Sequence, residues 1–194
     1  MSKRLVIVSK FISKYLRHEP ETLGLTLEPG GWVSIADLLD GAERQGFPIT
    51  EAELLQVVVE SDKQRFALDD SKTRIRANQG HSTSVDLQLN EVEPPTCLYH
   101  GTVDKFLDAI LLEGLKKMSR HDVHLSKDIA TATKVGERRG KPIILVIDSM
   151  RMSADGYKFR LSENGVWLTD YVPPRYIQLL AGGLAVEIRR AGEQ

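Results

Sequence analysis

The sequence contains very little cysteine, because Cys97 is the only one among 194 residues. An internal disulfide is therefore excluded, and so is a zinc site built from several cysteines. Long apolar runs are also missing. The stretch Leu5–Val8 is too short for the core of a secretory signal peptide, and no segment approaches the roughly 20 apolar residues that span a bilayer. We therefore expect a cytoplasmic protein with no membrane partner.

A strong net charge is absent too, since 26 Lys and Arg stand against 27 Asp and Glu. The distribution of charge is nevertheless uneven, because residues 1–18 contain no Asp or Glu. This segment predicts a local basic surface that binds a few phosphates rather than a long duplex. Its basic residues and histidine are Lys3, Arg4, Lys10, Lys14, Arg17 and His18.

The common catalytic motifs are missing as well. The chain has no glycine-rich phosphate loop, no G-x-G-x-x-G after a predicted strand and no H-E-x-x-H helix. A nucleophile elbow is also absent. His121 and His124 lie three residues apart but lack a matching set of cysteine or acidic ligands, so we expect no metal site.

In the first half of the chain, apolar residues at helical spacing and two capping boxes predict three helices. The first helix has a basic stripe of Lys10, Lys14 and Arg17, and it ends before Pro20. A strand, a turn and a second strand follow, which completes the pattern of a winged helix. The expected helices cover residues 3–17, 34–44 and 50–59, and the strands cover 65–68 and 73–76.

A polar, acidic stretch from Ser84 to Pro95 then predicts a linker, and we place the domain border between residues 92 and 93. The second half mixes short strands with helices, so the fold class is α+β. Asn164-Gly165 predicts the turn of a hairpin. The expected strands cover residues 98–102, 123–125, 141–147, 157–161 and 165–169, and the helices cover 103–112 and 128–137.

Six short strings of unusual composition remain. Each has an ordinary structural explanation when it is taken alone, such as a polar turn or a buried histidine. The strings are Leu16-Arg17-His18, Lys63-Gln64-Arg65-Phe66, Gln79-Gly80-His81-Ser82, Tyr99-His100-Gly101-Thr102, Arg120-His121-Asp122-Val123-His124-Leu125-Ser126 and Glu163-Asn164-Gly165-Val166-Trp167.

Together, and in this order, the strings closely resemble the RNA 2'-phosphotransferase family, which comprises the KptA type in bacteria and tRNA 2'-phosphotransferase in eukaryotes. The resemblance extends from about Phe11 to about Trp167, and residues 182–194 lie outside it as a variable tail. It implies a winged-helix lobe over residues 1–92 that binds the RNA phosphate. It also implies an ADP-ribosyltransferase-like lobe over residues 93–194 that binds NAD.

The resemblance also assigns roles to residues. The family's essential Arg-His-Arg-Arg set falls on Arg17, His18, Arg65 and Arg120, with Arg138 as an alternative for the last position. The expected NAD-binding residues are Gln79, Gly80, His81, Ser82, His100, Gly101, Thr102, His124, Leu125 and Ser126.

The implied reaction removes an internal 2'-phosphate from RNA by way of an ADP-ribosylated RNA. Its products are RNA with a 2'-hydroxyl, nicotinamide and ADP-ribose 1'',2''-cyclic phosphate. A monomeric enzyme that acts on 2'-phosphorylated RNA with NAD as co-substrate is thus expected.

Two alternative functions stay open. One is a mono-ADP-ribosyltransferase that acts on protein or on nucleic-acid phosphate ends, and the other is a winged-helix transcription regulator. The acidic residues around Thr50–Val59 count against the regulator because they would repel DNA phosphates.

Overall fold

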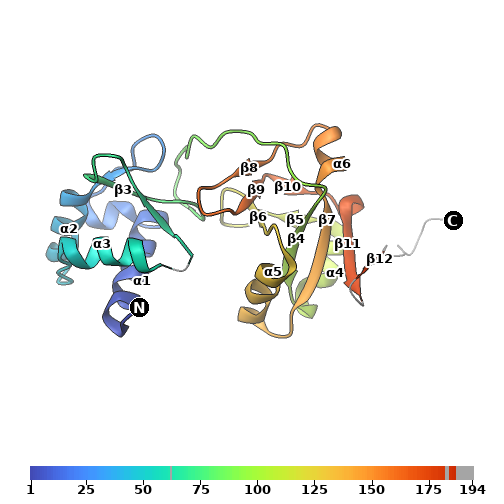
Figure 1. Ribbon diagram of the computed structural model, residues 1–194, viewed down its shortest axis with the longest axis horizontal. Helices are drawn as coiled ribbons and strands as arrows, with labels where there is room; N and C mark the ends of the chain where they lie inside the picture. Colours follow the sequence, from blue (N-terminus) through green and yellow to red (C-terminus); the bar gives the residue numbers. More distant parts are fainter. Residues whose placement is uncertain (62, 182–183, 187–194) are drawn as a thin grey trace. The chain divides into compact units, whose positions relative to one another are not determined.

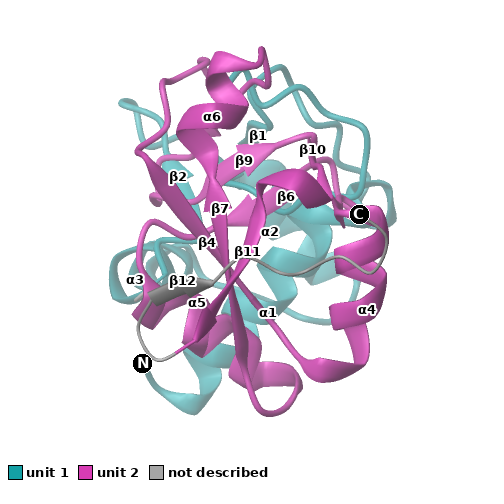
Figure 2. Cartoon of the chain, turned by 90° about the vertical axis from the view of Figure 1, so that its right-hand side faces the viewer, with its two compact units in different colours: residues 1–89 teal, residues 90–194 magenta. Residues whose placement is uncertain are grey.

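The computed structural model describes residues 1–61, 63–181 and 184–186 (Figure 1). The chain divides into two compact units, residues 1–89 and residues 90–194, which Figure 2 shows in different colours. Both units combine helices with strands, and all the named strand pairs are antiparallel. The α+β class is therefore confirmed. No helix among the described residues is both long enough and apolar enough to cross a membrane.

The first unit contains the three predicted helices and the predicted hairpin. A short strand joins the hairpin to give a three-stranded sheet in the order β1-β3-β2. The elements are α1 (Lys3–Arg17), the 3-10 helix η1 (Pro20–Leu23), β1 (Val33–Ser34), α2 (Ile35–Arg44), α3 (Glu51–Glu60), β2 (Phe66–Leu68) and β3 (Arg74–Ala77). Its core is apolar, and Ile12, Leu16, Leu38, Leu54 and Ile75 are completely buried in it.

Helix α3 begins at Thr50 because the side chains of Thr50 and Glu53 cap the backbone reciprocally. Arg4 of α1 donates to the Glu53 carboxylate at 2.8 Å, which connects the two helices. These hydrogen bonds, with the one from Arg4 the largest contribution, lower the pKa of Glu53 to about 2. The predicted capping box is thus confirmed, and it also helps to pack α3 against the amino end of α1.

The second unit contains three small sheets. Strands β12, β11, β7 and β4 form a four-stranded sheet in that order, β6-β9-β8 form a second sheet, and β10 pairs with β5. The elements are β4 (Cys97–Thr102), α4 (Asp104–Glu113), β5 (Leu115–Lys116), β6 (Val123–Leu125), α5 (Ile129–Gly136), η2 (Glu137–Arg139), β7 (Ile143–Asp148), α6 (Ser149–Ala154), β8 (Arg160–Leu161), β9 (Trp167–Thr169), β10 (Tyr171–Val172), η3 (Pro174–Tyr176), β11 (Ile177–Ala181) and β12 (Leu184–Val186).

Most elements expected in the second half are present, including the hairpin of β8 and β9. None of β5, α6, β10 and β11 was predicted from the sequence. The predicted variable tail, residues 182–194, lies outside the described residues except for β12.

Helix α5 lies directly on strand β4, backbone against backbone. A Cβ atom at Gly101 would lie only 1.8 Å from the carbonyl oxygen of Ala132 and 2.9 Å from the nitrogen of Gly136. Only glycine permits this approach, since a Cβ contact below 3.0 Å forces something to move. Gly101 therefore fixes how α5, and the turn η2 that follows it, lie against β4.

Candidate functional site

The first unit carries a basic corner formed by Arg17, His18 and Arg65. Arg17 is the last residue of α1, and His18 is its C-cap. The Nη2 atom of Arg17 lies 3.5 Å from the carbonyl oxygen of Arg65, and Arg65 in turn donates to the hydroxyl of Ser61 at 3.4 Å. The structure thus brings together three of the four predicted catalytic residues.

A loop after β3 packs against this corner. The backbone nitrogens of Ser82 and Thr83 donate to the carbonyl oxygen of Arg17 at 2.9 and 3.2 Å. The His18 Nδ1 atom lies 2.8 Å from the Ser82 hydroxyl oxygen. This bond orients the imidazole.

The string Gln79–Ser82, expected to bind NAD, therefore belongs to the first unit and adjoins Arg17 and His18. Gly80 has a φ of +88° and lies against the Arg17 side chain, which would be 3.9 Å from a Cβ atom there. The His81 side chain is only 1% exposed, so it is part of the interior of the unit. Within this string, the backbone and the Ser82 hydroxyl are what contact the basic corner.

Asn78 supports the corner through two hydrogen bonds, and no pattern in the sequence indicated it. Its side-chain nitrogen donates to the Gln64 carbonyl at 2.7 Å, and its backbone nitrogen donates to the Arg65 carbonyl at 2.9 Å. Gln64 has a φ of +41°, which is unfavourable for a residue with a side chain. Asn78 thus stabilises a strained turn immediately before Arg65.

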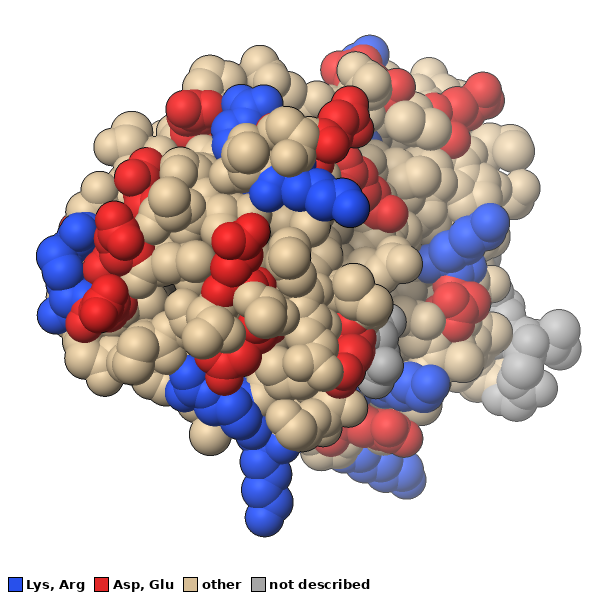
Figure 3. All heavy atoms as spheres, turned by 60° about the vertical axis from the view of Figure 1, so that its left-hand side comes forward, with Lys and Arg blue, Asp and Glu red and all other residues tan. Residues whose placement is uncertain are grey.

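The residues of the corner also line a groove of about 530 Å³ along α1. On the face in Figure 3, acidic and basic side chains are interspersed, which agrees with the near-zero net charge. The groove lining differs from this mixture, because among the described residues it combines five Lys or Arg with a single acidic residue, Glu60. This lining favours an anionic ligand.

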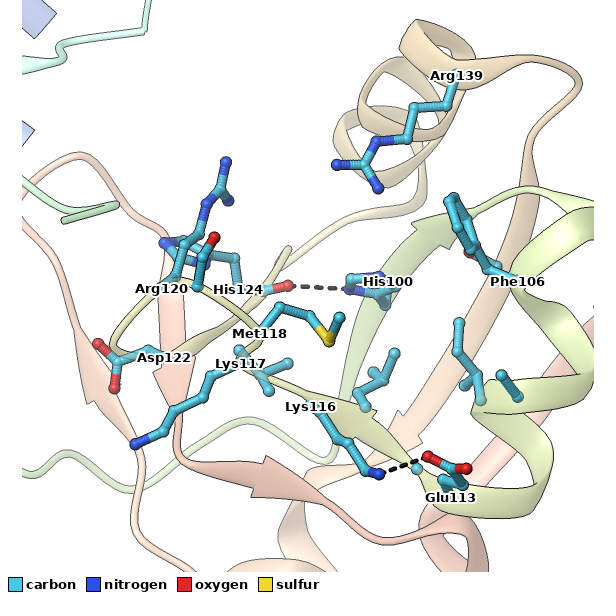
Figure 4. A pocket seen from close by; sticks show the side chains of 17 residues that line it. His100, Phe106, Glu113, Lys116, Lys117, Met118, Arg120, Asp122, His124 and Arg139 are labelled. Carbon is cyan, nitrogen blue, oxygen red and sulfur yellow. Dashed lines mark hydrogen bonds and ion pairs between the residues drawn. The ribbon is translucent and has the colours of Figure 1, made fainter. Parts of the chain in front are cut away.

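The second unit has a separate pocket of about 390 Å³ (Figure 4). Three of the predicted NAD-binding residues line it, namely His100 and Thr102 from β4 and His124 from β6. The His100 Nδ1 atom lies 3.1 Å from the carbonyl oxygen of His124. A carbonyl can only accept, so this Nδ1 carries the proton and Nε2 is the acceptor in the neutral ring.

Burial lowers the pKa of His100. The hydrogen bond to His124 opposes this shift, while the positive charge of Arg139 adds to it. His100 is therefore neutral near pH 7, and it offers a hydrogen-bond acceptor rather than a positive charge to whatever occupies the pocket.

Arginines supply the positive charge of this pocket. Arg120 and Arg139 both line it, and in Figure 4 Arg120 lies to the left of His100 and Arg139 lies above it. Partial burial and the charges of Arg139 and Arg138 lower the pKa of Arg120. An arginine still keeps its proton, so the cluster presents concentrated positive charge that an anion would stabilise. Arg138, the alternative candidate, is not among the lining residues.

The other predicted NAD-binding residues of this unit, Gly101, Leu125 and Ser126, help to hold the fold together around the pocket. Gly101 provides the close approach of α5, and Leu125 is 1% exposed in the core. The backbone of Ser126 exchanges hydrogen bonds with Tyr99 at 2.8 and 2.9 Å, which joins the end of β6 to β4. These residues hold His100 and His124 in place rather than lining the pocket.

Several lining residues were missed from the sequence. They complete a pocket whose walls are partly apolar and partly basic. For two of them the sequence did contain a signal, because Lys116 and Lys117 are adjacent basic residues shortly after Gly114, at which helix α4 ends. The missed residues include Phe106, Ile110, Leu115, Lys116, Lys117 and Arg139.

Within the part of the chain that the structure describes, no group of three or more His, Cys, Asp or Glu side chains is arranged to hold a metal ion. The polar groups of both linings include arginine, lysine, histidine and hydroxyl side chains, which are donors suited to phosphate oxygens.

Comparisons with known proteins agree on one family. The model of the RNA 2'-phosphotransferase, Tpt1 / KptA family matches residues 3–171. The chain is 56% identical over 177 residues to a probable RNA 2'-phosphotransferase of Trichormus variabilis, covering 91% of this chain and 97% of that protein. It is 57% identical over 175 residues to one of Nostoc punctiforme, with 90% and 97% covered. It is also 55% identical over 179 residues to one of Streptomyces coelicolor, with 92% and 97% covered.

Proposed function

Because the chain belongs to the RNA 2'-phosphotransferase family, we propose that it is an NAD-dependent enzyme that removes an internal 2'-phosphate from RNA. The first unit is then a winged-helix lobe that binds the RNA phosphate, and the second is an ADP-ribosyltransferase-like lobe that binds NAD. The observation that carries the proposal is that each unit holds a cationic site whose lining includes residues of the family's strings, Arg17, His18 and Arg65 in the first unit and His100, Arg120 and His124 in the second.

The pocket of the second unit fits NAD in size and chemistry. Its volume of about 390 Å³ lies in the usual range for a small-molecule site. The apolar side chains of Phe106 and Ile110 suit a flat base, and the guanidinium groups of Arg120 and Arg139 suit a pyrophosphate. Neutral His100 offers an acceptor for a ribose hydroxyl.

In the proposed reaction, the RNA 2'-phosphate displaces nicotinamide from the ribose carbon of NAD and gives an ADP-ribosylated RNA. The adjacent ribose 2''-hydroxyl then attacks the phosphorus and expels the RNA 2'-oxygen, which gives 2'-hydroxyl RNA and ADP-ribose 1'',2''-cyclic phosphate. The chain supplies positioning and charge rather than strong base catalysis. A phosphate monoester near pH 7 is already largely dianionic, and nicotinamide departs as a neutral molecule. Good orientation of two reactants is worth up to about 7–11 kcal/mol.

Arginines suit this task because each presents a planar fork of donors and keeps its charge. We assign Arg17 and Arg65 to the RNA phosphate, and Arg120 to the charge that accumulates on the phosphoryl oxygens during transfer. No metal is required by this scheme, since guanidinium groups neutralise the phosphate charge.

His18 is assigned the proton transfer of the second step. The leaving group of that step is a ribose 2'-oxygen, which departs poorly unless it is protonated. The Ser82 hydroxyl holds the Nδ1 edge of His18, which fixes the orientation of the imidazole that would donate the proton to that oxygen.

The test is incubation of the purified protein with a 2'-phosphorylated oligonucleotide and NAD, followed by analysis of the products. The expected products are 2'-hydroxyl RNA, nicotinamide and ADP-ribose 1'',2''-cyclic phosphate. A reaction that stops at ADP-ribosylated RNA would identify a mono-ADP-ribosyltransferase instead. Loss of the phosphate without NAD would refute the dependence on NAD. His18→Ala should slow the second step and accumulate the ADP-ribosylated RNA.

A further inference from the structure

The groove of the first unit extends well beyond the basic corner. Arg17, His18 and Arg65 occupy only part of its lining, and the rest follows α1 toward its amino end. Ser9, Ser13 and Arg17 recur every four residues, so they lie along one face of the helix. The remaining described lining residues are Met1, Val6, Lys10, Lys14, Glu60 and Lys63.

The chemistry of this extension suits a sugar-phosphate backbone. Serine hydroxyls and lysine ammonium groups are typical donors to phosphate and sugar oxygens. Apart from the imidazole of His18 in the basic corner, no aromatic side chain is among the described lining residues, so the extension offers no aromatic platform on which a base can stack. The lining therefore favours a ligand recognised by its backbone rather than by its base.

Lys10 is the cation of the extension that is best placed for such a ligand. It is exposed and forms no ion pair with any described residue. Lys14, one turn nearer the corner, already pairs with Glu19 at 3.0 Å. Lys3, on the same helix, is exposed but does not line the groove.

The dimensions limit how much RNA the extension holds. Lys10 lies seven residues before Arg17, which is about 10 Å along a helix axis. Neighbouring phosphates in one strand of a duplex are separated by about 3.4 Å along the axis, and by more in an extended strand. Glu60, which lies 3.4 Å from the Met1 amino group, also lines the groove, and its carboxylate would repel a phosphate placed beside it. The extension therefore has room for one or two nucleotides.

We propose that the α1 groove binds the phosphodiester backbone of a nucleotide next to the 2'-phosphorylated one, with Lys10 and Ser13 as donors, irrespective of its base. This inference rests on the proposed function, because the basic corner must hold the 2'-phosphate for the groove to hold its neighbour. The chain of a short single-stranded RNA then continues from Arg17 toward Lys10.

The test compares two substrates at saturating NAD: a 2'-phosphorylated pentanucleotide and a nucleoside 2'-phosphate. Lys10→Glu should raise KM for the pentanucleotide by about threefold to tenfold, with kcat unchanged, because one phosphate contact is lost. KM for the nucleoside 2'-phosphate should stay the same. Lys3→Glu adds the same charge to the same helix outside the groove and should change neither KM.

Salt dependence gives a second readout. Removing one phosphate contact should reduce the slope of log affinity against log salt for the pentanucleotide by about 0.7. Changing the base of the neighbouring nucleotide should leave the effect of Lys10→Glu unaltered. Equal effects of Lys10→Glu on both substrates, or of Lys3→Glu and Lys10→Glu on the pentanucleotide, would overturn the inference. Failure of the wild-type protein to release the 2'-phosphate from either substrate would instead overturn the proposed function.

Discussion

Replacing Gly101 with alanine tests whether the contact between α5 and β4 sets the geometry of the pocket. The new Cβ atom would lie 1.8 Å from the carbonyl oxygen of Ala132, whereas ordinary contact begins at about 3.4 Å. The helix and the strand must therefore separate by about 1.6 Å. His100 and Thr102 flank the substituted residue, and Arg139 follows α5 in η2, so the lining would change on two sides.

The cost can be estimated from this clash. Overpacking in a well-packed interior costs about 1–3 kcal/mol, and we expect the upper end because both groups that must move are backbone. For a chain of this length, about 3 kcal/mol lowers the Tm by roughly 6–12 °C. A misplacement of about 1 Å in a catalytic site can cost about 100-fold in rate, so kcat/KM should fall by a similar factor.

Gly156→Ala is the matched control in the same unit. Gly156 has a φ of +92° and no atom within 4 Å of the new Cβ, so its cost is backbone strain alone, about 1 kcal/mol. Thermal denaturation would measure the Tm of both variants, and steady-state kinetics would measure their kcat/KM. A Gly101→Ala protein that melts no lower than Gly156→Ala, or that keeps the wild-type kcat/KM, would refute the reasoning.

Three further predictions follow from individual contacts. Asn78→Ala should lower kcat severalfold without changing KM for NAD, because it frees the strained Gln64 turn of the first unit; Asn78→Asp, which lacks the donor, should not rescue it in steady-state kinetics. Arg139→Ala should weaken binding of ADP-ribose in calorimetry more than Arg138→Ala, because only Arg139 lines the pocket, and equal effects would contradict this. Since the folded pKa of His100 lies below its ordinary 6.5, the unfolded chain binds that proton more readily, and stability falls as the pH drops through 6.5. His100→Gln should therefore lose less stability than the wild type between about pH 7 and pH 5 in urea denaturation, and parallel losses would argue against the shift.

The parts of the fold that could be predicted are those whose signals are local. The box of Thr50 and Glu53 is formed by residues three apart, and the long apolar stripe of α1 is visible within one segment. Strand β5 has only two residues, and its partner β10 lies more than fifty positions later. No periodicity can reveal a two-residue strand whose existence depends on a distant partner.

The candidate site shows the same limit. His100, His124 and Arg120 all belong to the six sequence strings, and all three line the pocket of the second unit. The choice of Arg139 over Arg138 depends on the direction in which η2 turns after α5, which adjacent identical residues cannot reveal. Asn78 acts through a backbone carbonyl fourteen residues earlier, and nothing in the composition around it indicates that contact.

The basic corner is formed by two segments that lie far apart in the sequence, so one is synthesised well before the other. Arg17 and His18 leave the ribosome early, but the groups that orient them, Ser82 and Thr83, follow more than sixty residues later. Pairings of this kind form only after the intervening chain has been synthesised and has folded back. A nascent first unit therefore has a complete helix α1 well before Ser82 and Thr83 can orient Arg17 and His18, and its basic corner is complete only when this last loop has folded.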